Sequence, residues 1–201
     1  MSTSDGVGAR VVQTAGPVLI IGSGLLGASL GLALRAGGVR VYLEDASPTS
    51  LRLASDVGAG QAFGDVLAEA GVCPNDCGLD TPSYKAPSIV VVATPPDVAD
   101  RVIVESLLRF PDAIVTDVAS VKDAVVADVL RGLEREDRLE AASRYVGSHP
   151  MAGRERSGAG AADADLFYGR PWVIVAHEST WPRAVLVARA LATDVGAVPL
   201  E

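Results

Sequence analysis

Cysteine and histidine are scarce in this chain of 201 residues, since each type occurs only twice. The cysteines, Cys73 and Cys77, have no second pair beside them, and His149 and His177 lie far from them along the sequence. A structural zinc site normally takes four such ligands at close spacing, so we expect no bound metal. Two free thiols in a reducing cytoplasm are the simplest expectation, and a bridge between them across the intervening loop is the alternative.

Clusters of basic residues are also absent, and the formal net charge is −8. A nucleic-acid-binding protein needs lysine and arginine side chains that neutralise phosphates, so this class is excluded. Residues 1–16 lack both the basic start and the apolar core of a secretory signal. We therefore expect them to form a flexible lead-in, and we expect a cytoplasmic location. No membrane association is expected either, because the apolar stretch at residues 17–34 contains glycines at the spacing of a phosphate-binding loop.

What the sequence does contain is a glycine motif near its N-terminus, within PVLIIGSGLLGASLGLAL. Aliphatic residues precede the motif and a helical pattern of small residues follows it, which is the order strand, tight turn, helix typical of dinucleotide-binding proteins. Gly22 permits the turn, Gly24 lets the backbone approach a pyrophosphate, and Gly27 lets the helix lie close to its strand. The N–H groups of Leu25 and Leu26 belong to the positive end of that helix. We predict that these five residues bind a dinucleotide, and an ordinary buried strand–helix unit is the alternative.

A carboxylate follows at the distance where such proteins hold the adenosine ribose. Residues 39–45, VRVYLED, are predicted to form the next strand, and they end in Glu44 and Asp45. Asp45, about twenty residues after the motif, is the residue that we expect to accept hydrogen bonds from the ribose hydroxyls. No arginine follows immediately, and a carboxylate repels a 2′-phosphate, so NAD is the expected cofactor rather than NADP.

The rest of the chain alternates strands and helices. Strands are predicted at residues 89–93, 113–118, 144–147, 171–176 and 197–200, and helices at residues 50–57, 98–109, 119–139, 161–168 and 181–193. Residues 58–87 lose this periodicity apart from a helical piece at residues 65–70, and we interpret them as a surface excursion. The alternation predicts an α/β fold, a doubly wound and mostly parallel sheet of the Rossmann type, with one dinucleotide-binding domain at residues 17–201.

Two loops after predicted strands carry hydroxyl groups with two interpretations each. Thr94 can cap the next helix with Asp97 as its reciprocal partner, and it also lies where a strand ends beside the expected cofactor. Ser120 with Asp123 likewise fits a capping box, and a functional role is the alternative. A third loop carries GSHPMAGRERSG, which combines an imidazole, a carboxylate and two guanidinium groups. Such polar and charged side chains are unsuited to a hydrophobic core, so we expect this loop to lie at a cleft.

Together these motifs resemble those of the prephenate dehydrogenases. The resemblance is carried by GSGLLGASLGLAL at the glycine motif, ATPP at residues 93–96, TDVASVK at residues 116–122, GSHPMAGRERSG at residues 147–158 and LFYGRPWVI at residues 166–174. The first is generic for dinucleotide-binding folds, whereas TDVASVK and GSHPMAGRERSG are specific. The resemblance implies oxidative decarboxylation of prephenate to 4-hydroxyphenylpyruvate with reduction of NAD, a step towards tyrosine.

The resemblance also implies roles for three residues. His149 matches the family histidine that hydrogen-bonds the substrate hydroxyl, and a neutral imidazole is suited to accept that proton. Ser120 matches the serine that helps to hold the hydroxyl and the histidine in register. Glu155 matches a carboxylate at the mouth of the site with a gating or pH-sensing role, and a solvated charge between two arginines is the alternative. We expect His149 and Ser120 to be catalytic, and all three residues to contact the substrate.

In one respect the chain departs from the family pattern. The resemblance implies a helical dimerisation domain after the nucleotide-binding domain, and no such domain follows Glu201 in this sequence. That domain supplies an arginine for a substrate carboxylate and most of the interface of the homodimer expected for the family. The alternatives left open are a dehydrogenase acting on prephenate, one acting on arogenate, and a folded NAD-binding module without turnover of its own. A β-hydroxyacid dehydrogenase is a more distant alternative, since it would carry a catalytic lysine in a following helical domain.

Overall fold

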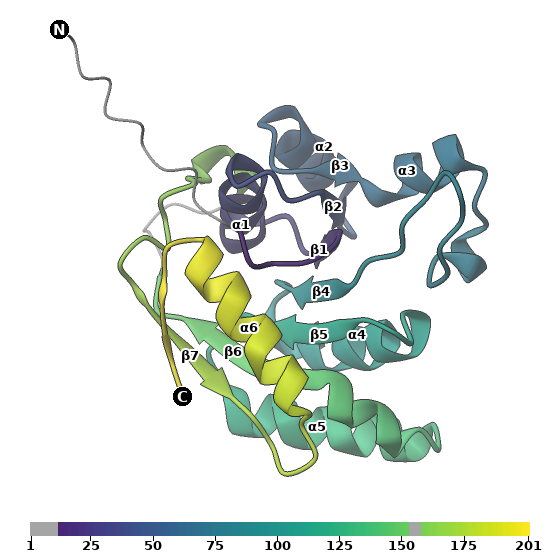
Figure 1. The fold of residues 1–201 in the computed structure, drawn as a ribbon, viewed down its shortest axis with the longest axis vertical. Coiled ribbons are helices and arrows are strands. Elements are labelled where there is room, and N and C mark those ends of the chain that lie inside the picture. Colours follow the sequence, from purple (N-terminus) through teal and green to yellow (C-terminus); the bar gives the residue numbers. More distant parts are fainter. Residues whose placement is uncertain (1–11, 153–157) are drawn as a thin grey trace, which may run out of the picture.

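The fold is a single twisted sheet with helices on both faces (Figure 1). The computed structural model describes residues 12–152 and 158–201. Within them eight strands lie in the order β3-β2-β1-β4-β5-β6-β7-β8, and every neighbouring pair is parallel except β6 and β7. The strands are β1 (Val18–Ile21), β2 (Val41–Glu44), β3 (Gln61–Ala62), β4 (Ile89–Val92), β5 (Ile114–Asp117), β6 (Tyr145–Pro150), β7 (Pro171–Val175) and β8 (Val198–Leu200). The predicted doubly wound, mostly parallel α/β sheet is confirmed.

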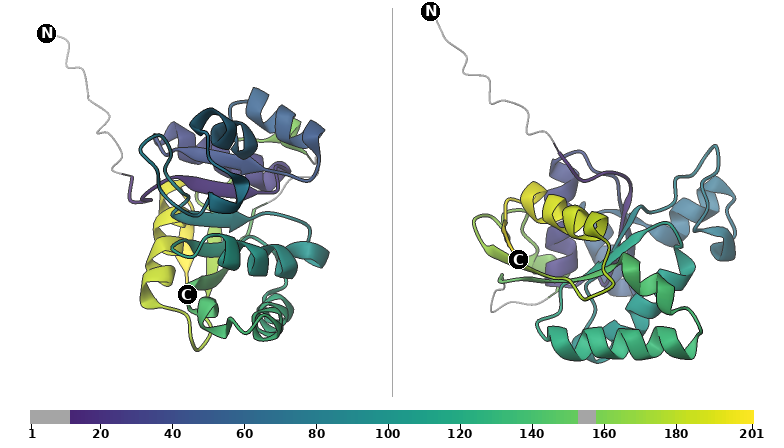
Figure 2. Two further views of the ribbon diagram at one scale, coloured as in Figure 1. Left: turned by 90° about the vertical axis from the view of Figure 1, so that its right-hand side faces the viewer. Right: turned by 60° about the horizontal axis from the view of Figure 1, so that its bottom comes forward.

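Helices connect most of these strands and divide between the two faces of the sheet. The α-helices in the described residues are α1 (Leu25–Ala36), α2 (Pro48–Asp56), α3 (Phe63–Ala70), α4 (Pro96–Arg109), α5 (Lys122–Arg135) and α6 (Pro182–Asp194), and the 3₁₀ helices are η1 (Pro74–Asp76), η2 (Leu139–Arg144) and η3 (Ala159–Ala161). Helices α1 and α6 cover one face, whereas α4 and α5 cover the other (Figure 2).

The central strands are buried on both faces, which explains why their sequences are continuous apolar runs rather than alternating ones. In β1, Val18 and Ile20 pack into the core beneath α1 and α6, while Leu19 between them packs into the opposite core beneath α4 and α5. All three side chains are fully buried. Burial of this kind contributes about 1.5–3 kcal/mol for each large aliphatic side chain.

Residues 58–87 are more than the predicted surface excursion. They form β3, which extends the sheet beside β2, and then α3 and η1. The loop after η1 is fixed from within, because Cys77 and Tyr84 are buried and the Tyr84 hydroxyl donates to the Cys77 carbonyl oxygen at 2.7 Å. Both cysteines are free thiols, and Cys73 is exposed.

Three predicted boundaries are wrong for identifiable reasons. Helix α5 ends at Arg135 rather than near residue 139, because Asp137 adopts a left-handed conformation with φ of 55°. Strand β6 continues to Pro150, because it pairs with β7 over four residues. The helix predicted at residues 161–168 is replaced by η3 and turns, and the N–H of Asp163 donates to the Ser29 hydroxyl of α1.

The end of the predicted lead-in contacts the folded domain. The backbone N–H groups of Gln13 and Thr14 donate to the carboxylate of Asp194 at the end of α6. The earlier residues 1–11 lie outside the described part of the chain. None of the helices in the described residues is both long enough and apolar enough to cross a membrane.

Candidate functional site

Five predicted site residues lie along one edge of the sheet. Strands β2, β1, β4, β5 and β6 are consecutive parallel neighbours, so their carboxyl ends share this edge. The edge carries Asp45 after β2, Gly22 after β1, Thr94 after β4, Ser120 after β5 and His149 near the end of β6. The four strand spacings from β2 to β6 correspond to about 19 Å. In parallel α/β sheets ligands bind outside this edge.

The glycine turn has the geometry that the sequence pattern requires. Gly22 has a φ of +102°, and a Cβ there would lie 2.5 Å from the carbonyl oxygen of Ala93. A Cβ on Gly27 would lie 1.9 Å from the carbonyl oxygen of Gly22, so only glycine lets α1 approach the turn this closely. By contrast, apart from its chain neighbours, no atom of the described residues lies within 4 Å of the Cβ position of Gly24. The backbone at Gly24 is therefore open to a ligand.

The first turn of α1 leaves its N–H groups available. Gly24 is the N-cap residue and supplies no side-chain hydrogen bond, and the first turn contains no acidic residue. The N–H groups of Leu25, Leu26 and Gly27 have no acceptor four residues earlier within the helix. Together with the positive end of the helix dipole they form a site suited to a phosphate anion.

Two buried hydroxyl groups beside this turn have no hydrogen-bond partner among the described residues, namely Ser23 Oγ and Thr94 Oγ1. The predicted capping role of Thr94 is wrong, because the N-cap of α4 is Pro95 and no side chain caps that helix. Asp97 therefore makes no reciprocal bond. Buried hydroxyls are normally paired, so these two fit a ligand that supplies the missing partner.

The Asp45 carboxylate already holds the glycine turn in place. Its Oδ2 accepts from the N–H of Ser23 at 2.6 Å, and its Oδ1 accepts from the N–H of Ser47 at 2.7 Å. A carboxylate has about four acceptor sites, so capacity remains for two ribose hydroxyls.

A cavity of about 420 Å³ adjoins Asp45. Its lining comes from the ends of β1, β2 and β4 and from one side of α4, and includes Gly22, Glu44, Asp45, Thr94, Val98, Val102 and Arg109. It is an adenosine-sized recess next to the predicted ribose carboxylate.

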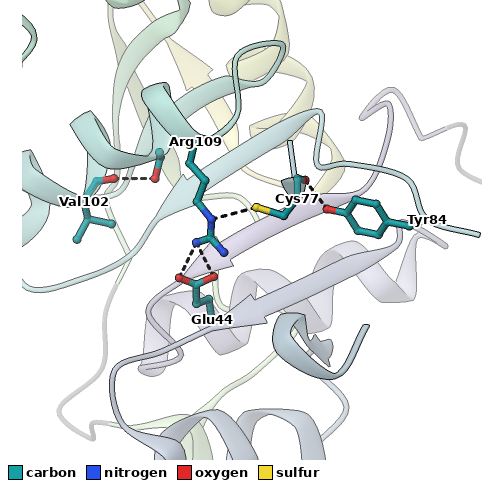
Figure 3. Close-up of polar contacts among 6 residues, drawn as sticks. Glu44, Cys77, Tyr84, Val102 and Arg109 are labelled. Carbon is teal, nitrogen blue, oxygen red and sulfur yellow. Dashed lines mark hydrogen bonds and ion pairs between the residues drawn. The ribbon is translucent and has the colours of Figure 1, made fainter. Parts of the chain in front are cut away.

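An ion pair at the wall of this cavity was not predicted from the sequence (Figure 3). The Arg109 Nη1 donates to both Glu44 carboxylate oxygens, each at 2.9 Å, and its Nε donates to Cys77 Sγ at 3.1 Å. The guanidinium carbon also lies 5.3 Å from the Phe63 ring centre and 5.0 Å from that of Phe110. Arg109 ends a helix 65 residues after Glu44, so no local pattern signals the contact.

The catalytic residues implied by the resemblance come from adjacent strands. His149 lies in β6 opposite Val173 of β7 and is half-buried, and its imidazole makes no hydrogen bond to another described residue. Ser120 is exposed in the bend before α5. Its predicted capping box with Asp123 is wrong, because the N-cap of α5 is Val121 and it has no side-chain bond. Glu155 lies outside the described residues.

A buried polar network beneath Ser120 and His149 joins β5 to β6, and the sequence analysis missed it. Asp117 is fully buried, and its carboxylate accepts from Lys122 Nζ, from the N–H of Ala119 at 2.8 Å and from the Tyr145 hydroxyl at 2.7 Å. The hydroxyl of Ser148, next to His149, donates to the Asp117 carbonyl oxygen at 2.6 Å. The polar residues Thr116 and Asp117 at the end of an otherwise apolar strand were the available signal.

Burial sets the protonation behaviour of this network. It lowers the pKa of Lys122, although the charge and the hydrogen bond of Asp117 oppose the shift. Burial also raises the pKa of Tyr145 well above its ordinary value, and the Asp117 charge adds to the increase. Tyr145 therefore stays neutral at pH values where an exposed tyrosine would begin to ionise.

The glycine turn, the open helix end and the carboxylate after β2 define the class of this protein, a dinucleotide-binding α/β domain. The family model described as "Prephenate dehydrogenase, nucleotide-binding domain" matches residues 30–200. The chain belongs to this family.

Individual relatives agree with the family match. A probable prephenate dehydrogenase, NovF, of Streptomyces niveus is 36% identical over 189 residues, which cover 90% of this chain and 44% of that protein. Prephenate dehydrogenase of Bacillus subtilis (strain 168) is 28% identical over 173 residues, or 84% of this chain and 41% of that protein. The structure of prephenate dehydrogenase from A. aeolicus in complex with hydroxyphenyl propionate and NAD+ has a TM-score of 0.74 at 25% identity, covering 92% of this chain and 59% of that one. The chain thus spans less than half the length of the first two relatives.

Proposed function

We propose that this chain forms the NAD-binding half of a prephenate dehydrogenase, which oxidises and decarboxylates prephenate to 4-hydroxyphenylpyruvate. The observation that carries the proposal is the row of Asp45, Gly22, Thr94, Ser120 and His149 along one sheet edge. The row begins with a carboxylate suited to a ribose and ends with an imidazole suited to a proton transfer. The family membership supports the same assignment.

The residues around the turn fit the cofactor. In this proposal the first-turn N–H groups of α1 hold the pyrophosphate, and Asp45 accepts from the adenosine ribose. The hydroxyls of Ser23 and Thr94 are buried and have no partner among the described residues, so a bound dinucleotide would complete their hydrogen bonding. NAD, when bound, supplies the hydride acceptor.

In the proposed reaction the protein itself needs to transfer one proton and to place the substrate. A hydride leaves the ring carbon that carries the hydroxyl group, and loss of the ring carboxylate as carbon dioxide makes the ring aromatic. His149 accepts the hydroxyl proton, and Ser120 holds the hydroxyl in register with the imidazole. Correct placement of that carbon beside the nicotinamide provides the remaining rate enhancement.

Replacement of His149 tests the proposed chemistry. In the active protein, with prephenate as substrate and NADH formation as readout, His149→Asn should lower kcat by about 10²–10⁴-fold because proton transfer is lost. Its NAD affinity, measured by calorimetry, should persist. His177→Asn is the matched control, because His177 follows β7 at the opposite edge of the sheet and contacts the Ala142 carbonyl oxygen. Equal losses of kcat in both variants, or loss of NAD binding in His149→Asn, would contradict the assignment.

A further inference from the structure

Three carboxylates, those of Glu44, Asp45 and Glu105, and one guanidinium, that of Arg109, line the cavity beside Asp45. Among the described residues, Asp45 accepts from two backbone N–H groups and Glu105 forms no ion pair, whereas Glu44 is paired with Arg109 through both of its oxygens. The Arg109 side chain is 24% exposed and that of Glu44 is 36% exposed, so the pair stands at the cavity wall rather than in the core.

Arg109 is held in place by contacts other than Glu44. Its guanidinium lies over the rings of Phe63 and Phe110, and its Nε donates to the Cys77 sulfur. Burial works to lower the pKa of Arg109, but Glu44 and Cys77 raise it above its usual range, so the group stays charged. Without Glu44, these contacts would keep the guanidinium at the cavity, where it would lack the ion pair that it makes in this structure.

A free guanidinium there would change which dinucleotide fits. NAD and NADP differ by one phosphate on the adenosine ribose, and a guanidinium fork is the side chain best matched to a phosphate. The ribose is the part of the cofactor assigned to Asp45, which lines the same cavity as Arg109. Arg109 thus has the chemistry to bind such a phosphate, but in this structure its guanidinium is paired with the Glu44 carboxylate.

We propose that Glu44 determines cofactor selectivity by pairing with Arg109, so that no free cation is available to a ribose 2′-phosphate. This inference rests on the proposed function, because it concerns the same dinucleotide site. Asp45 repels the phosphate directly, while Glu44 removes the attraction that would offset this repulsion. The pair makes the site selective for the non-phosphorylated dinucleotide.

Calorimetric titration of the folded chain with NAD and with NADP tests the inference. The readout is the ratio of the two Kd values, in which a general loss of binding cancels. Glu44→Gln should shift this ratio towards NADP by about 10- to 100-fold, the value of one or two charge-assisted hydrogen bonds. Glu44→Ala should do the same, and it provides a second variant in case the amide retains Arg109.

Glu105→Gln is the matched control, because Glu105 is exposed, lines the same cavity and forms no ion pair with a described residue. It removes the same charge, but the ratio should change by less than about threefold. The double variant Glu44→Gln/Arg109→Gln should lose the NADP gain.

Three results would overturn the inference. An equal shift in Glu44→Gln and Glu105→Gln would mean that net charge alone matters, and a gain that survives removal of Arg109 would mean that the guanidinium is not the ligand. Selective NAD binding with no shift in either Glu44 variant would refute the role of Glu44 while leaving the proposed function intact. Binding of neither dinucleotide by the folded wild-type chain would refute both.

Discussion

At the scale of single residues, Asp117 stands out because its carboxylate is fully buried and needs hydrogen-bond donors. A buried carboxylate is costly unless its oxygens are paired, and here an ammonium, a backbone N–H and a phenol all donate to it. Because the same residues connect the end of β5 to β6, the network fixes the spacing between the loop of Ser120 and the strand of His149. In the proposed active site, the placement of Ser120 and His149 thus depends on buried groups behind them.

Removal of the Tyr145 hydroxyl should lower stability and change its pH dependence. At neutral pH, Tyr145→Phe should cost about 1–3 kcal/mol, because Asp117 loses a buried donor. Above the ordinary pKa of 10.0, the unfolded wild type ionises Tyr145 while the folded state holds its proton, so wild-type stability falls as pH rises. The variant should lack this part of the alkaline loss.

Urea unfolding of both proteins below and above pH 10 measures the effect. Tyr84 also has a raised pKa, but it is present in both proteins and its contribution cancels. Identical alkaline slopes in the two proteins would show that Tyr145 is not the titrating group.

The role of a residue could be predicted from the sequence where it depends on the neighbouring residues in the chain. It could not be predicted where it depends on contacts with distant segments. Gly22 and Gly27 are needed because of a turn and a helix that begin within a few residues of them. Arg109 meets Glu44 only after the sheet has formed, so its role was invisible in the sequence. Thr94 and Ser120 matched capping patterns, but a helix start at Pro96 or Lys122 leaves them one position too early.

At the scale of elements, the β1–α1 unit contains one glycine that is needed for packing, Gly27, and one that we expect to be needed for binding, Gly24. Gly27→Ala should lower the free energy of unfolding by about 1–3 kcal/mol or more, because its methyl group meets a backbone oxygen. Gly24→Ala meets open space and should cost about 1 kcal/mol or less as an N-cap change. Its methyl group should nevertheless weaken NAD binding, because in the proposed binding mode the pyrophosphate approaches at this residue.

Chemical denaturation and NAD calorimetry on the two variants separate these effects. The expected pattern is a stable Gly24→Ala protein with weakened binding and a destabilised Gly27→Ala protein. Wild-type NAD affinity in Gly24→Ala would argue against the approach of the pyrophosphate at that residue.

At the scale of the whole molecule, most of the order of strands and helices was predictable because buried parallel strands are continuous apolar runs, although β3 was missed. The antiparallel pairing of β6 with β7 was not, since strand direction depends on a long-range contact. The loop of Cys77 and Tyr84 was also misjudged, because its polar sequence conceals two side chains buried against α4 and β2. The β6–β7 pairing and this loop can be predicted only when the segments that pack against them are known.

The most direct test of the account is a calorimetric titration of the folded chain with NAD. The account predicts saturable binding of one NAD per chain, since one glycine turn leading into α1 and the carboxylate of Asp45 beside it lie along the described sheet edge. No measurable binding by a chain that unfolds cooperatively would contradict the central claim that this edge is a dinucleotide site.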